Sequence, residues 1–223
     1  MAFEVQRINQ LLQEVKAVCT KVQRNPEDIK ILAATKYADV EQINTVISAG
    51  LTIIGENRLQ DAKRKFPLLL PVEKHFIGTL QLNKVKTVVR LFDWIESVDR
   101  VDLTEKVDRE CEKLNKKMPV LVEVNVAMDA HKHGIALSET FDFIERIAKF
   151  WHIKIHGLMA IIPYFSDAEE SRHYFRAMKT LYDFCRKRYK GFDTLSMGMS
   201  HDFKVAIEEG STEIRIGSYL FKN

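Results

Sequence analysis

Apolar side chains recur at intervals of three and four residues along the first 24 positions of the chain. The stripe consists of Val5, Ile8, Leu11, Leu12, Val15, Val18 and Val22. This spacing places the apolar side chains on one face of an α-helix. Asn25 and Pro26 then mark the end of the helix. The pattern predicts an amphipathic helix ahead of the main body of the protein.

After Pro26, short apolar runs alternate with segments of helical period. Eight runs are found, at residues 29–36, 51–57, 74–80, 94–99, 120–126, 154–162, 194–199 and 213–221. Continuous apolar runs of this length are typical of strands in a parallel sheet that is covered on both faces. Because no proline- or glycine-rich linker interrupts the alternation, it predicts one domain over residues 1–223, an α/β fold of the (β/α)₈ barrel type.

The last apolar run extends almost to Asn223, which leaves no room for a helix after the eighth strand. We therefore expect the N-terminal helix to cover the place of the absent last helix. The number of helices then still comes to eight.

Sequence also suggests where some helices begin. Asp39 with Gln42, and Ser166 with Glu169, have the spacing of a capping box. Ser200 precedes another segment of helical period and is expected to cap it.

Composition narrows the class of protein. The chain is 46% hydrophobic and 29% charged, with a net charge of +3, as in ordinary soluble globular proteins. This charge is too small to favour nucleic acid or an anionic membrane as a partner. The longest apolar stretch, residues 157–165, is far shorter than the roughly 20 residues of a membrane-spanning helix. The N-terminus lacks the apolar core of a signal peptide. Three widely separated cysteines favour a reducing compartment, and we expect a cytoplasmic protein.

Lys36 stands where the first buried strand is predicted to stop. Barrel enzymes keep their chemistry at the carboxyl ends of the strands. A lysine that is partly desolvated there loses its proton more easily and becomes a nucleophile for carbonyl groups. The alternative is a solvated lysine at the start of a loop, and position alone favours this alternative.

Two glycine-containing segments strengthen the chemical interpretation of Lys36. "SMGMS" (196–200) follows the seventh predicted strand, and "RIGSYLF" (215–221) belongs to the eighth. Barrels frequently bind phosphate between the loops that follow these two strands. The first and eighth strands close the barrel, so Lys36 is expected beside this phosphate site. Pyridoxal 5′-phosphate (PLP) requires a lysine that reacts with its carbonyl group and a phosphate site next to it.

Seven segments of the chain resemble, in order, the motifs of the YggS/PROSC family of PLP homeostasis proteins. They are "TKYADVEQI", "GENRLQDA", "HFIGTLQLNKVK", "IESVD", "VNVAMDAHKHGI", "GLMAIIPYF" and "LSMGMSHDFKVAIEEGSTEIRIGSYLF". The resemblance spans nearly the whole chain and implies a barrel similar to the N-terminal barrel of alanine racemase. It also implies that PLP is held covalently, as an aldimine, on the lysine that matches Lys36.

The same matching implies where the rest of the cofactor lies. Asn57 is implied beside the ring, and Arg215 opposite the pyridine nitrogen. The phosphate is implied to lie against Ser196, Met197, Gly198, Ser200, Gly217 and Ser218. Five positions depart from the family pattern and affect the expected entrance of the site: Thr35, Tyr37, Asp39, Thr79 and His133.

The nature of Arg215 bears on whether such a protein is an enzyme. Arginine is always charged and only donates hydrogen bonds, so it would keep the ring nitrogen unprotonated. PLP chemistry at an α-carbon works best when that nitrogen is protonated. The other interpretation of Arg215 is a surface pair with a carboxylate such as Glu213.

Alanine racemase also uses a second base, a tyrosine from a separate domain, and we expect no such domain here. We therefore expect a monomeric carrier that binds and buffers PLP, hands it to PLP-dependent apo-enzymes, and supports vitamin B6 and amino-acid homeostasis. The alternative function is a weak PLP-dependent amino-acid racemase.

Histidine spacing predicts no metal site. His152 and His156 are spaced as metal ligands on a helix, but they fall at the edge of a strand, about 13 Å apart. His131 and His133 are expected in a loop. His75 is expected to be a hydrogen-bonded residue at the barrel rim.

Overall fold

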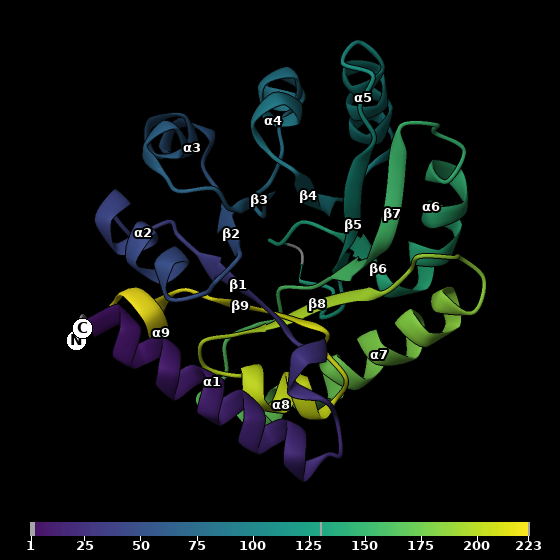
Figure 1. Cartoon of the computed structure of the whole chain (residues 1–223). Helices are drawn as coiled ribbons and strands as arrows, with labels where there is room; N and C mark the ends of the chain where they lie inside the picture. The colour runs from purple at the N-terminus through teal and green to yellow at the C-terminus, as the bar shows by residue number, and fades with distance from the viewer. Residues whose placement is uncertain (1–2, 130, 223) are drawn as a thin grey trace.

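The computed structural model describes residues 3–129 and 131–222, which form a closed parallel barrel surrounded by helices (Figure 1). Eight strands close the barrel in the order β4-β3-β2-β1-β9-β8-β7-β5, and β4 pairs with β5. Their bounds are β1 Lys30–Ala34, β2 Ile53–Glu56, β3 Glu73–Phe76, β4 Trp94–Val98, β5 Met118–Asn125, β7 Ile153–Met159, β8 Thr194–Met199 and β9 Glu213–Ile216. Each falls within or overlaps one of the eight apolar runs, so the (β/α)₈ barrel is confirmed. A two-residue strand that the sequence did not predict, β6 (Ile135–Ala136), pairs with the end of β5.

Nine α-helices are found in the described part of the chain. They are α1 Phe3–Lys21, α2 Val40–Ser48, α3 Leu59–Lys65, α4 Val85–Leu91, α5 Val101–Glu112, α6 Thr140–Ile147, α7 Arg172–Arg186, α8 Phe203–Glu208 and α9 Ser218–Phe221. Short 3₁₀ turns lie at Pro26–Asp28, Phe66–Leu68, Leu82–Lys84, Leu137–Glu139 and Ala168–Ser171.

The apolar core lies between the strands and the surrounding helices. Val88 of α4, Ile95 of β4 and Val120 of β5 are among its fully buried members. The inside of the barrel differs, because charged residues are buried there. Glu96 of β4 and Ser196 of β8 are hydrogen-bonded although their strands are not neighbours, so the bond crosses the barrel interior.

Helix α1 covers the place that the sequence assigned to it. Figure 1 shows α1 running beside α8 and α9. Leu11 is fully buried. Glu14 accepts a hydrogen bond from the Tyr219 hydroxyl at 2.7 Å and forms an ion pair with Lys204 at 2.7 Å. Apolar burial and polar contacts together fix α1 against the barrel.

The expectation that no helix follows the last strand is wrong. Strand β9 ends at Ile216, and α9 forms a single turn in which the Leu220 and Phe221 amides donate to the Gly217 carbonyl. Leu220 and Phe221 are buried. A short apolar run has no periodicity that distinguishes a strand from a buried helical turn. The prediction of eight helices fails for the same reason.

Of the three predicted helix starts, one is confirmed. Asp39 and Gln42 form the reciprocal capping box of α2. The pair of Ser166 and Glu169 does not form one, because Asp167 accepts the bond from the Glu169 amide and caps a 3₁₀ turn.

The predicted cap at Ser200 is also wrong. The Ser200 hydroxyl accepts hydrogen bonds from the amides of Gly217 and Tyr219, both at 3.2 Å. Helix α8 starts after Asp202, whose carboxylate accepts a bond from the Met199 amide. Ser200 therefore links the loop after β8 to the loop after β9.

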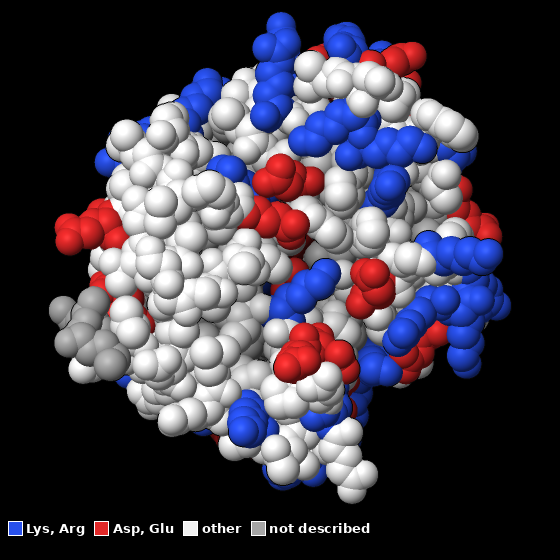
Figure 2. Space-filling view, viewed as in Figure 1, with Lys and Arg blue, Asp and Glu red and all other residues white. Residues whose placement is uncertain are grey.

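On the face shown in Figure 2, basic and acidic side chains are interspersed around a broad uncharged area over the side where Figure 1 places α2. Within the described residues, none of the helices combines the length and the apolar character needed to cross a bilayer.

Candidate functional site

Lys36 lies two residues beyond the end of β1, and its side chain is exposed. Its ammonium group lies 5.0 Å from the centre of the Tyr37 ring, and Lys222 lies 4.6 Å from the same ring. The expected partial desolvation of Lys36 is therefore not found. The described residues offer Lys36 no ion pair, so its amine is accessible to a ligand.

A buried ion pair between Lys65 and Glu56 fixes the backbone before Lys36. Lys65 of α3 donates to Glu56 at 3.1 Å and to the Thr35 carbonyl at 2.9 Å. The Thr35 hydroxyl donates to the Gly55 carbonyl at 3.1 Å and to Glu56 at 3.3 Å. An accessible amine thus follows a rigidly held residue.

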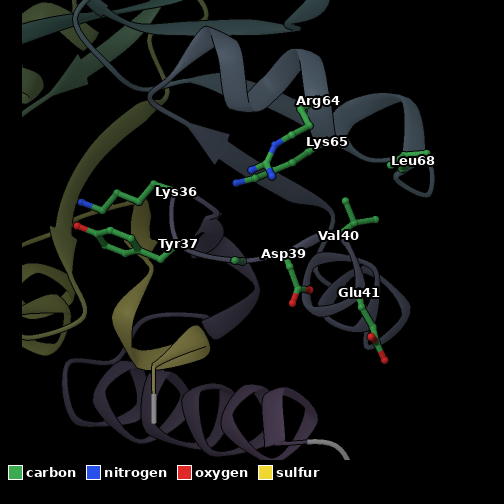
Figure 3. Close-up of a pocket in the computed structure, with 9 residues that line it drawn as sticks. Lys36, Tyr37, Asp39, Val40, Glu41, Arg64, Lys65 and Leu68 are labelled. Carbon is green, nitrogen blue, oxygen red and sulfur yellow. The ribbon is translucent and has the colours of Figure 1, made fainter.

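A hollow of about 530 Å³ adjoins this loop and is lined by residues of α2 and α3 as well as by Lys36. Figure 3 shows that the Lys36 and Tyr37 side chains extend together away from Glu41 and Leu68. The amine of Lys36 therefore points away from this side of the hollow.

Asn57 follows β2 directly and contains an unsatisfied acceptor. Its Oδ1 atom is buried and has no hydrogen-bond partner among the described residues. A Cβ atom added to Gly78 would lie 2.4 Å from the Asn57 carbonyl oxygen, so only glycine allows this close approach. A buried acceptor without a partner is costly in free energy and is suited to a ligand that donates a hydrogen bond.

A second hollow, of about 420 Å³, lies where the loops after β8 and β9 meet. It is lined by Arg7, Tyr164, Ser200, His201, Ser218 and Tyr219. The hydroxyls of Ser200 and Ser218 and the Arg7 guanidinium offer donors to an anion there. The structure thus brings two of the expected phosphate residues, Ser200 and Ser218, to one hollow. Gly217, which precedes Ser218 in the chain, is linked to Ser200 because its amide donates a hydrogen bond to the Ser200 hydroxyl.

Ser196 lies elsewhere. Its side chain is fully buried inside the barrel, where it donates to Glu96 at 3.0 Å and accepts from Arg215 at 2.7 Å. The Met197 side chain is buried in the apolar core. A Cβ atom at Gly198 would lie 2.5 Å from Ala206 of α8, and Gly198 has a φ of +93°. These three residues therefore pack within the fold and do not line the second hollow.

Arg215 is only 4% exposed and is fixed by two hydrogen bonds. One runs to the Ser196 hydroxyl, and the other runs to the Ala160 carbonyl at 2.8 Å. The alternative of a surface pair with Glu213 is wrong, because Glu213 is buried and its Oε1 atom has no hydrogen-bond partner among the described residues. Two bonds leave Arg215 with further N–H donors.

His75 lies inside the barrel, not at its rim, and its hydrogen bonds are satisfied as expected. Its Nδ1 atom lies 2.5 Å from Glu96 and its Nε2 atom 2.8 Å from Glu73. Burial alone would lower the pKa of His75, but the bonds to Glu73 and Glu96 outweigh burial and raise it to about 9. Both ring nitrogens therefore carry protons.

Two buried carboxyl groups also have raised pKa values, which for a carboxyl group favours the neutral form. Burial, with the charge of Glu96 next in effect, raises the pKa of Glu213 to about 7. Burial and the nearby Asp99 raise the pKa of Glu123 to about 7.

His75, Glu96 and Glu213 present ligand atoms within 4.8 Å of one another, the spacing of a metal site. A metal needs a free lone pair on the histidine, whereas both nitrogens of His75 donate to carboxylates. This cluster therefore suits protons better than a metal ion. His152 and His156 lie beside Asp108 and Asp193, respectively, and do not share a partner.

Sequence reasoning missed Glu96, Lys65, Arg7 and His201. Glu96 had a usable signal, since it is a carboxylate in the middle of an apolar strand, where a buried charge needs partners. The other three come from helices or loops that only the fold brings to the site.

Comparison with known proteins gives the family. Residues 8–223 match the family described as alanine racemase, N-terminal domain. The chain belongs to this family. It is 38% identical over 219 residues to a pyridoxal phosphate homeostasis protein of Aquifex aeolicus, covering 97% of this chain and 96% of that protein. It is 34% identical over 217 residues to the pyridoxal phosphate homeostasis protein of Escherichia coli K12, covering 95% and 93%. The resemblance to PLP homeostasis proteins is thereby confirmed, and these relatives are not named as enzymes.

Solved structures agree with this placement. A structure described as an unknown protein from Bifidobacterium adolescentis superposes with a TM-score of 0.92 at 31% identity, covering 98% of this chain and 94% of that one. PipY of Synechococcus elongatus, solved with PLP bound, gives a TM-score of 0.81 at 30% identity, covering 93% and 99%. Alanine racemase of Clostridium difficile shares the fold, with a TM-score of 0.74 at 15% identity, and this chain spans 55% of its length.

Proposed function

We propose that this protein binds PLP covalently through Lys36, buffers it, and releases it to PLP-dependent apo-enzymes. The observation that carries the proposal is the pairing of β1 with β9. Lys36 follows the first of these strands, and Gly217 and Ser218 follow the second. An accessible amine and a hollow with anion-binding donors therefore follow adjacent strands of the barrel.

The residues around these two features fit the cofactor. The neutral amine of Lys36 would add to the PLP aldehyde, with loss of water. Ser200, Ser218 and the amides near Gly217 would hold the phosphate, and Asn57 has an unused acceptor for a ring substituent. Ser196 and the Met197 side chain are left out of the phosphate set because of where they are buried.

Arg215 supports a carrier. PLP supplies an electron sink for α-carbon chemistry when its ring nitrogen is protonated. A permanently charged guanidinium opposite that nitrogen disfavours protonation. Named relatives of this chain are PLP homeostasis proteins, which supports the same role. Cys19, Cys111 and Cys185 are buried and free, in keeping with a reducing compartment such as the cytoplasm. We propose a monomer that acts there.

Covalent trapping tests the attachment point. The purified protein is loaded with PLP, reduced with borohydride and digested, and the pyridoxyl adduct is located by mass spectrometry. We expect the adduct on the peptide that contains Lys36. Lys36→Ala should lose it, whereas Lys190→Ala, at an exposed lysine, should retain it. An adduct confined to surface lysines would contradict the proposal.

Phosphate recognition needs a separate test. A hydrogen bond to a charged group contributes about 1.5–3 kcal/mol, so Ser218→Ala should weaken PLP binding roughly tenfold or more and still leave some. Pyridoxal, which lacks the phosphate, should bind far more weakly than PLP. Comparable affinities for the two ligands would exclude a phosphate site.

Transfer distinguishes a carrier from a protein that merely binds PLP. The loaded protein is mixed with a PLP-dependent apo-enzyme, and recovery of that enzyme's activity is followed. We expect the activity of the apo-enzyme to recover faster than PLP dissociates from the loaded protein on its own. No recovery above the rate of free release would contradict the hand-over.

A further inference from the structure

A continuous line of hydrogen bonds crosses the barrel interior and ends at Arg215. His75 of β3 donates to one oxygen of Glu96 at 2.5 Å. The other oxygen of Glu96 accepts from the Ser196 hydroxyl at 3.0 Å, and this hydroxyl accepts from Arg215 at 2.7 Å. We call His75, Glu96 and Ser196 the relay. Because Glu96 and Ser196 stand on non-adjacent strands, the relay crosses the barrel interior and does not follow from strand pairing.

Every member of the relay has a fixed hydrogen-bonding role. Both nitrogens of His75 face carboxylates, so both donate. Glu96 is fully buried and accepts at each of its oxygens. The Ser196 hydroxyl has one proton, which it donates to Glu96, and its oxygen accepts from Arg215. His75 and Ser196 thus both donate to Glu96, and Arg215 donates to Ser196, so the direction of each bond is determined.

The buried negative charge of Glu96 gives a physical reason for the relay, because that charge needs hydrogen-bond donors. A buried carboxylate without partners is costly, and Glu96 is stabilised by His75 and by the nearby charge of Arg215. Glu213 also lies close to His75 and Glu96. Its Oε1 atom has no hydrogen-bond partner among the described residues, although its carboxyl group lies within hydrogen-bonding reach of Ser196. The Ser196 hydroxyl donates to Glu96 at 3.0 Å. Burial alone would raise the pKa of Glu96, but its bond to His75 lowers it, whereas burial raises the pKa of Glu213 to about 7, so Glu96 is the anion of the two and orients Ser196.

We propose that Glu96 and Ser196 are positioning residues that fix the Arg215 guanidinium for contact with the ring nitrogen of PLP, and that His75 holds Glu96 in place. This inference rests on the proposed function for the identity of the ligand and for the position of its ring nitrogen opposite Arg215. The hydrogen bonds that carry it are present in the protein itself.

The first experiment needs no ligand. Side-chain ¹⁵N NMR of the full chain reports the Arg215 guanidinium, which is assigned from the spectrum of Arg215→Lys. In the unmodified protein we expect resolved guanidinium signals, because Ser196 and Ala160 restrict rotation. Ser196→Ala should average or shift these signals. Ser211→Ala removes an equally buried hydroxyl that bonds only to backbone carbonyls, and it should leave them unchanged. Arg215 signals that are identical in Ser196→Ala and in the unmodified protein would overturn the relay.

The second experiment measures the contact with the ring. PLP is compared with its 1-deaza analogue, in which a carbon atom replaces the ring nitrogen. We expect the unmodified protein to prefer PLP by about tenfold or more, as for loss of one hydrogen bond to a charged group. Ser196→Ala should reduce this preference to less than about threefold, since the bond is no longer aligned. Ser211→Ala should keep it.

Glu96→Gln is a second variant that retains the shape of the side chain. Glutamine offers one acceptor oxygen to two donors, so one bond of the relay is lost. We expect a preference for PLP between those of the unmodified protein and Ser196→Ala. A preference for PLP that is undiminished in both variants would overturn the inference. A protein that binds no PLP would instead contradict the proposed function, and the NMR result would still decide whether the relay orients Arg215.

Discussion

The ammonium group of Lys65 donates a hydrogen bond to the Thr35 carbonyl, 2.9 Å away, and thereby holds the residue that precedes Lys36. The same ammonium pairs with the fully buried Glu56. Removal of one partner of such a pair leaves an uncompensated buried charge and costs about 3–5 kcal/mol. One lysine thus supports the loop from which another is expected to react.

Lys65→Met should therefore lower the free energy of unfolding by about 3–5 kcal/mol, as measured by urea denaturation. Lys63→Met, at an exposed position of the same helix, should change it by no more than about 0.5 kcal/mol. Adding Glu56→Gln to Lys65→Met should recover part of the loss, since the buried charge is gone. Equal stability of Lys65→Met and Lys63→Met would contradict the role of the pair.

The contribution of helix α1 can be measured with two adjacent leucines. Leu11 is fully buried against the barrel, whereas Leu12 is 46% exposed. Leu11→Ala should cost about 2–5 kcal/mol of unfolding free energy, the usual range for a buried leucine. Leu12→Ala should cost much less. If both variants unfold at the same denaturant concentration, α1 does not stabilise the barrel as described.

Gly78 is expected to be essential for the position of Asn57. A methyl group there would lie 2.4 Å from the Asn57 carbonyl oxygen and 2.8 Å from its Cα atom. Gly78→Ala should lower stability by about 1–3 kcal/mol through overpacking and should also weaken PLP binding. Gly191→Ala meets no atom within 4 Å but has a φ of +77°. It should lose stability through backbone strain alone and keep its affinity for PLP, as measured by fluorescence titration.

Stability should depend on pH through His75. Its pKa is raised from 6.5 to about 9 in the folded protein, so the folded state binds more protons than the unfolded state between these values. The stabilisation by His75 is fully present below pH 6.5 and is lost as the pH rises towards 9, by at most about 3 kcal/mol. Urea midpoints at pH 6 and pH 9 measure this loss. The pH dependence of stability between 6.5 and 9 should flatten in His75→Gln. It should persist in His131→Gln, which changes an exposed histidine. If stability is still lost over this range in His75→Gln, another group is responsible for the loss.

Catalysis by the PLP-loaded protein should be near background. Deuterium exchange at the α-carbon of a panel of amino acids reports any racemase or transaminase chemistry. Exchange at an enzyme-like turnover of about 1 s⁻¹ or faster would favour the racemase alternative. Arg215→Glu is the informative variant, because a carboxylate opposite the ring nitrogen would allow its protonation and so some exchange, provided that PLP still binds.

The sequence alone determined the fold class of this protein. Eight apolar runs and the stripe of α1 were sufficient because burial on both faces of a parallel strand, or on one face of a helix, imposes a period on the chain. Lys36 and the glycine-containing segments were singled out in the same way, since each lies at or near the end of a predicted strand. Periodicity failed at Ser218–Phe221, where so short a segment fits a strand and a buried turn equally well.

The tertiary structure alone decided which side chains meet. Ser196 and Ser200 are four residues apart, yet one faces the barrel interior and the other faces the loop after β9. The contact of Ser196 with Glu96 spans 100 positions of the chain and depends on barrel closure. Local sequence determines period and turn chemistry, whereas the partners of a buried charge are set by strand order and register, which are properties of the closed barrel as a whole.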